Sequence, residues 1–92
     1  MRTILIDGST LETEQDFHNL IMEECDFPQY GCNLDALWDV LLDNASGPVA
    51  FSWINADLSQ ERLARFGDIV DIFHEAAKER NDLFFNIKTR DP

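Results

Sequence analysis

The chain has 92 residues with 18 Asp and Glu against 7 Lys and Arg, so its formal net charge is −11, and its length suits one domain, residues 1–92. This charge argues against nucleic acid and anionic membranes as partners, because both are bound chiefly by Lys and Arg that neutralise phosphate, and it favours a basic partner. Hydrophobic residues make up 45% of the chain and aromatic residues 11%, which excludes a disordered acidic segment and predicts a folded protein.

The chain is predicted to open with a short strand and an amphipathic helix. Residues 3–6 are β-branched or apolar and precede a turn pair at 7–8, which is typical of a strand followed by a turn. Thr13 and Asp16 have the spacing of a capping box, and the apolar residues that follow recur at helical intervals. We therefore expect a helix over 14–24.

A second helix is predicted after a loop that contains Pro28. Asn33 is a favourable N-cap residue, and the apolar residues between 34 and 41 lie at the intervals of a single helical stripe. The helix is expected to end near 43–44, with the stripe packed on the core.

The next three elements are a strand and two helices. Residues 49–54 have apolar side chains on both alternating faces, the pattern of an interior strand that is buried on both sides. A short helix over 61–66 is expected to end at Gly67, which suits a C-terminal cap. A longer helix over 68–80 carries Arg80 near its end, where a positive charge complements the helix dipole.

Residues 83–87 form the last predicted strand, so the order of elements is βααβααβ. Strands separated by pairs of helices need crossover connections. This order favours an α/β fold with a small parallel sheet of three strands and helices packed on it.

The sequence shows no signal for secretion, membrane insertion or metal binding. Few apolar residues precede the first acid, and the longest stretch without charge, 44–56, is shorter than the span of about 20 residues that a membrane helix needs. Cys25 and Cys32 form no C-x-x-C pair, and His18 and His74 are far apart in the chain. We expect a cytoplasmic protein with reduced thiols and with neither metal nor cofactor.

The second helix carries an acidic stripe opposite its apolar one. Asp35, Asp39 and Asp43 repeat at intervals of four, a spacing at which like charges cost an isolated helix about 0.2–0.5 kcal/mol per pair. Three interpretations are open: a solvated face, a docking surface for cationic groups together with Tyr30 and Gly31 of the loop, or a set of acid/base or metal-binding carboxylates. The last has the least support, because an exposed helical stripe offers no pocket to shift a pKa.

The tryptophans, the histidines and Glu75 are interpreted first as ordinary core or surface residues. Trp53 lies within a predicted buried strand and belongs in the core. Trp38 lies on the apolar stripe, with an edge close to the acidic residues that could face a partner. His18, His74 and Glu75 are expected on solvated helix faces.

The run YGCNLDALWD at residues 30–39 resembles the signature of the barstar family, the intracellular inhibitors of small secreted guanyl-specific ribonucleases such as barnase. The order of strands and helices agrees with this resemblance along nearly the whole chain. The resemblance implies a two-layer α/β domain with a three-stranded parallel sheet. It also implies that the second helix and the loop before it plug the active site of the ribonuclease, without any catalysis by this chain.

The resemblance also predicts where a partner would bind. It assigns Tyr30, Gly31 and Asn33 to the contacting loop and cap, Asp35 and Trp38 to the contacting helix, and Glu75 to an acidic contact on the last helix. Asp39 would lie at the centre, where its carboxylate would take the place of a substrate phosphate and face Arg and His side chains of the enzyme.

The chain departs from the family pattern on either side of this centre. Gln29 stands where a second loop tyrosine is expected, and Asp43 and Asn44 stand in place of Gly-Trp. The prediction is an inhibitor of a basic extracellular ribonuclease or related toxin, its own cognate or a more distant one rather than barnase, with no small-molecule substrate. The alternative is a barstar-like binding module or immunity protein for another basic protein.

Overall fold

The computed structural model describes residues 1–90, except for the side chain of Asn44. Three parallel strands, β1 (Arg2–Asp7), β2 (Val49–Ile54) and β3 (Leu83–Ile87), form one sheet in the order β1-β2-β3. The helical elements are η1 (Gly8–Thr10), α1 (Glu14–Glu24), α2 (Leu34–Asp39), the π-helical turn η2 (Val40–Asn44), α3 (Ala56–Arg62) and α4 (Phe66–Glu79). The predicted α/β fold with a three-stranded parallel sheet is confirmed.

Both helices of the first half begin at the predicted caps. The Thr13 hydroxyl accepts from the Asp16 amide at 3.2 Å, and the Asp16 carboxylate accepts from the Thr13 amide at 3.1 Å, so the capping box is formed. The Asn33 side chain accepts from the Ala36 amide at 2.7 Å and starts α2. Because η2 continues α2 to Asn44, the predicted end near 43–44 is also confirmed.

The boundary between α3 and α4 differs from the prediction. The helix expected over 61–66 instead covers Ala56–Arg62, and it follows Asn55, whose φ of 52° breaks the chain direction after β2. Gly67 lies in the first turn of α4, so its predicted role as a helix end is wrong. α3 ends at Leu63 instead, which has an extended backbone conformation and a buried side chain. A residue packed in the core therefore marks the end of this helix, and not the glycine.

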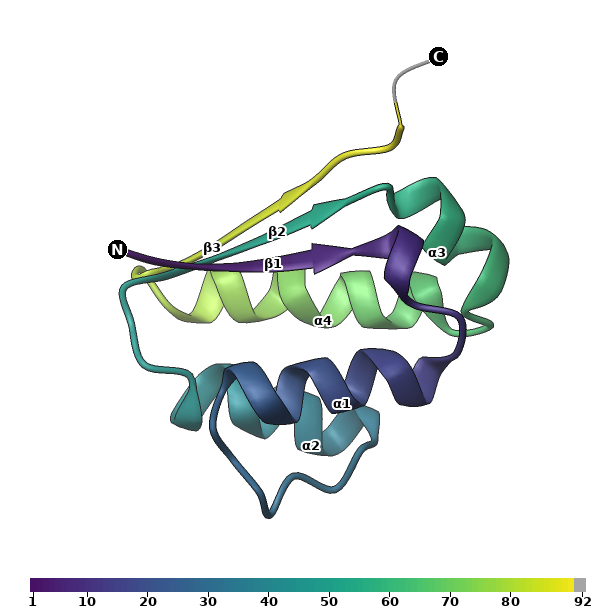
Figure 1. Ribbon diagram of the computed structural model, residues 1–92. Helices are drawn as coiled ribbons and strands as arrows, with labels where there is room; N and C mark the ends of the chain where they lie inside the picture. Colours follow the sequence, from purple (N-terminus) through teal and green to yellow (C-terminus); the bar gives the residue numbers. More distant parts are fainter. Residues whose placement is uncertain (91–92) are drawn as a thin grey trace.

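The sheet is covered by helices on one face only (Figure 1). Right-handed crossovers that step from β1 to β2 to β3 in one direction place α1, α2 and α4 on the same side. The interior position of β2 is confirmed, but its full burial on both sides is wrong, because alternate residues on the open face are only half-buried. On that face Leu5 is 53% and Phe84 is 49% exposed.

The core under the covered face is aromatic. Trp53 is fully buried, as predicted, and stacks on Phe17 with ring centroids 5.4 Å apart. Its indole N–H donates to the Ser59 hydroxyl at 2.9 Å, and the rings of Phe66 and Phe73 each form a T-shaped pair with the indole. Through these ring contacts, α1 and α4 pack against β2.

Candidate functional site

The acidic stripe lies on the outer face of α2 and η2. Leu37, Val40 and Leu41 are fully buried on the inner side, and this burial turns the opposite side of the helix toward solvent. The side chains of Asp35, Asp39 and Asp43 are accordingly exposed, which brings the three carboxylates onto one open surface.

The loop before α2 exposes its backbone beside this surface. Asp26 and Cys32 adopt φ values of 51° and 53°, which turn the loop sharply on either side of its tip. Gln29 and Gly31 are exposed. Because Gly31 has no side chain, its backbone is open to a partner group next to the N-terminus of α2.

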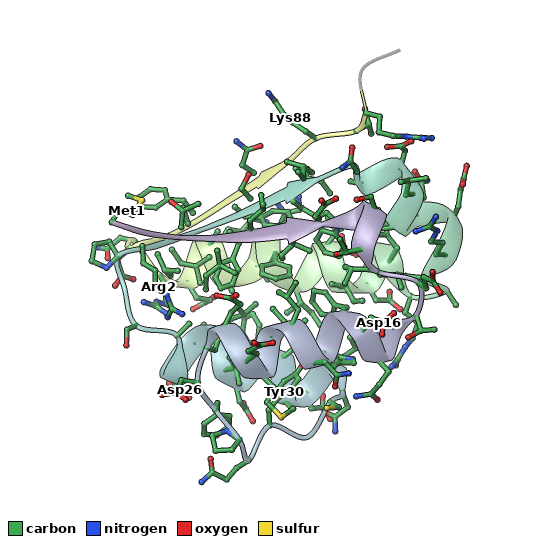
Figure 2. The ribbon with its side chains drawn as sticks, in the orientation of Figure 1. Met1, Arg2, Asp16, Asp26, Tyr30 and Lys88 are labelled. Atoms are coloured by element: carbon green, nitrogen blue, oxygen red, sulfur yellow. The ribbon has the colours of Figure 1, made fainter. Side chains whose placement is uncertain are left out.

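Tyr30 does not take the place that the sequence predicted for it. It was expected to supply contact area, but it is only 5% exposed and belongs to the core. Its hydroxyl is 2.5 Å from His18 Nδ1, and Figure 2 shows Tyr30 where the loop passes beneath α1. The expected exposure of the Tyr30 ring is therefore wrong, because the ring anchors the loop to α1.

His18 is also buried, at 1% exposed, where a solvated side chain was expected. Helical periodicity places it beside Phe17 and Ile21, at the margin of the apolar stripe. Whether a side chain at such a marginal position is buried depends on the path of the loop before α2. Here the Tyr30 ring of that loop packs against the His18 ring and covers it. The adjacent buried positions could have suggested burial, but the hydrogen bond to Tyr30 joins residues that no local pattern connects.

The environment of His18 favours its neutral form. Burial lowers its pKa, and the nearby Glu14 carboxylate opposes this effect. His18 Nε2 is 3.4 Å from Glu14 Oε2, while Arg65 binds both oxygens of Glu14 and holds its pKa below the usual range. The position of the carboxylate beside Nε2 favours the tautomer in which Nε2 carries the proton, and in this tautomer the Tyr30 hydroxyl donates to Nδ1.

Folding stability should therefore decrease as the pH falls below about 6.5, the ordinary pKa of histidine. In this range the unfolded chain takes up a proton that folded His18 resists, so the unfolded state is favoured by up to about 1.4 kcal/mol per pH unit. Urea denaturation between pH 5 and 8 measures the slope. His18→Gln should flatten this slope, because the variant lacks the imidazole whose proton uptake differs between the folded and unfolded states. A slope in the variant as steep as that of the wild-type protein would contradict this prediction.

The remaining predicted site residues lie around the stripe. Trp38 is half-buried and packs against the core, which agrees with a core residue that keeps an exposed edge. Glu75 is exposed on α4 and pairs with Lys78 at 3.2 Å, and α4 packs beside α2 and η2. The side chain of Asn44 lies outside the described part of the structure, so its expected contact stays a prediction.

The described part of the chain contains neither a metal site nor a helix that could cross a membrane. Within residues 1–90, no group of three His, Cys, Asp or Glu side chains is arranged to hold a metal ion. None of the described helices combines the length and the apolar composition that crossing a membrane requires.

Cys25 and Cys32 are free thiols, and burial raises the pKa of Cys25. An open hollow of about 370 Å³ is lined by residues of α1 and of the segment before it, none of which belongs to the predicted site.

Two comparisons with known proteins extend these observations. The sequence model of the family described as "Barstar (barnase inhibitor)" matches residues 1–90, which include the loop, α2 and α4. A protein of Bacillus subtilis (strain 168) called "Putative ribonuclease inhibitor YrdF" is 36% identical over 86 residues. That alignment covers 91% of this chain and 94% of the relative, so the similarity spans nearly the whole of both proteins.

Proposed function

Since this chain belongs to the barstar family of barnase inhibitors, we propose that it inhibits a small, basic, guanyl-specific ribonuclease by occupying its active site. The observation that carries the proposal is the exposed row of Asp35, Asp39 and Asp43 on a helix anchored to the core. Such a rigid anionic surface suits an active site built to hold RNA phosphates. The chain acts by binding alone and catalyses no reaction. It binds the ribonuclease in the cytoplasm, before the enzyme can cut cellular RNA.

In the complex, the Asp39 carboxylate occupies the position of a substrate phosphate. A carboxylate can accept two parallel hydrogen bonds from an arginine of the enzyme, which matches the geometry of phosphate recognition. Gln29, the Gly31 backbone and the exposed edge of Trp38 extend the contact, with Glu75 on α4 at its margin. Tyr30 contributes indirectly, because its buried ring holds the loop in place.

The partner is a cognate ribonuclease or a more distant toxin rather than barnase itself. Gln29 stands in place of a loop tyrosine and Asp43–Asn44 in place of Gly-Trp, and the family pattern places both of these aromatic residues in or near the contact surface. Aromatic side chains commonly supply much of the contact energy at protein interfaces. We expect weaker inhibition of barnase than of the cognate enzyme.

Titration of a guanyl-specific ribonuclease with the purified protein tests the proposal. Complete loss of RNA cleavage at a one-to-one ratio is expected, because one inhibitor molecule closes one active site. The same protein incubated with RNA alone should release no product, and release would favour an enzyme. Binding without inhibition would favour the second candidate, a binding module or immunity protein for another basic toxin.

Association should slow strongly with increasing salt. With a net charge of −11, the protein is attracted to a cationic enzyme, and this attraction is screened as the Debye length falls from about 10 Å at 0.1 M to about 3 Å at 1 M salt. We expect the association rate to fall by about tenfold or more over this range. Stopped-flow fluorescence measures the rate, and an association rate independent of salt would contradict electrostatic steering.

A further inference from the structure

Arg80 follows the last residue of α4, yet its side chain serves a different helix. Nη1 donates to the Leu41 carbonyl at 2.8 Å and to the Ala45 carbonyl at 2.7 Å. Nε and Nη2 donate to the two oxygens of Asp82 at 2.9 and 3.0 Å. The guanidinium is thus held in one orientation by four hydrogen bonds, and the side chain is only 15% exposed.

The two carbonyls lie at the end of the helix that carries the acidic stripe. The last turn of a helix leaves carbonyl groups without intrahelical partners, and these groups carry the negative end of the helix dipole. Here that turn is the π turn η2, closed by the Ala45 amide bonding to the Val40 carbonyl at 2.7 Å. Arg80 supplies both hydrogen bonds and positive charge to this end. The sequence assigned that charge to the dipole of α4, and the structure directs the side chain to η2 instead.

The same side chain connects the two helices expected to contact the partner. α2 and η2 carry Asp39 and Asp43, and α4 carries Glu75. Arg80 lies at the end of α4 and donates hydrogen bonds to carbonyls at the end of η2. These bonds limit how far α4 can slide or rotate against η2. The loop after η2 passes close by, since a Cβ on Gly47 would collide with the Arg80 and Asp82 side chains.

We propose that Arg80 is a positioning residue for the acidic binding surface. Resting on the proposed function, the inference is that Arg80 sets the position of Asp39 relative to α4, without touching the ribonuclease itself. The role requires a planar fork: a lysine would keep the charge but could not bind two carbonyls and both oxygens of Asp82 together. Geometry and charge can therefore be separated by experiment.

The first test uses the free protein and needs no partner. Amide hydrogen exchange across residues 40–45 should accelerate by about tenfold or more in Arg80→Lys and in Arg80→Met, because the end of η2 opens locally. Arg90→Met is the control, since it removes the same charge and breaks the ion pair with Asp57 at the other end of the sheet. If Arg80→Met fails to fold, Arg80→Lys decides. Exchange at 40–45 that matches the wild-type rate would overturn the inference.

The second test asks whether Arg80 acts through Asp39. Arg80→Lys should weaken binding to the inhibited ribonuclease by about tenfold in the wild-type background and by less than about twofold when Asp39→Ala is already present. Equal losses in both backgrounds would overturn the positioning role. A wild-type protein that inhibits no ribonuclease would instead contradict the proposed function, and the exchange measurement would then decide on Arg80 alone.

Discussion

Asp39→Ala is expected to weaken binding to the ribonuclease by about 3–5 kcal/mol, the cost of leaving buried cationic groups without their counter-charge. This loss corresponds to a decrease in affinity of roughly two to four orders of magnitude. Most of it should appear as faster dissociation, because the contact forms only after the two surfaces have docked. Surface plasmon resonance with the immobilised ribonuclease separates the two rates.

The control for this variant is Glu61→Ala, which removes one carboxylate from α3 at the far end of the sheet. Both variants change the net charge by one unit, so any effect on long-range attraction is shared. Only Asp39→Ala should accelerate dissociation. If the two variants dissociate from the ribonuclease at the same rate, Asp39 is not at the centre of the contact.

Trp53→Ala should reduce the free energy of unfolding by about 3–5 kcal/mol. The substitution leaves a large cavity among Phe17, Phe66 and Phe73, and it removes the hydrogen-bond partner of the buried Ser59 hydroxyl. A chain of 92 residues has a total stability of about 5–14 kcal/mol, so this loss is a large share. Urea denaturation followed by far-UV circular dichroism measures it, independently of the tryptophan signal that the variant loses.

Phe84→Ala provides the comparison on the open face of the sheet. Phe84 is 49% exposed, and its truncation should cost less than about 1 kcal/mol. A similar loss in both variants would mean that the open face contributes to stability as much as the covered core does.

Elements with strong local signals were predictable from the sequence. The Thr13–Asp16 capping box and the Asn33 cap depend on residues within one turn of each other, and both form as expected. The bounds of β2 agree with the predicted strand over 49–54, because apolar side chains on both alternating faces favour an interior strand. Gly67 does not end a helix, because a glycine permits a helix end without requiring one.

The candidate site was predictable only in part. The acidic stripe follows from helical periodicity, since an apolar face at residues 37–41 directs the opposite face outward. The burial of His18 and Tyr30 was not predictable, because it depends on a loop that folds back on α1. Arg80 was assigned to the wrong helix for the same reason: its carbonyl partners are 35 and 39 residues away in the chain.

The sequence by itself determined the α/β class, the caps at which α1 and α2 begin, and the row of carboxylates on α2 and η2, because each depends on residues close together in the chain. Tertiary structure decided which face of the sheet stays open, since the crossovers share one hand and one direction. It also decided that Tyr30 anchors the loop and that Arg80 holds the end of η2. Burial and long-range hydrogen bonds require partners from distant segments, and only the folded chain brings these segments together.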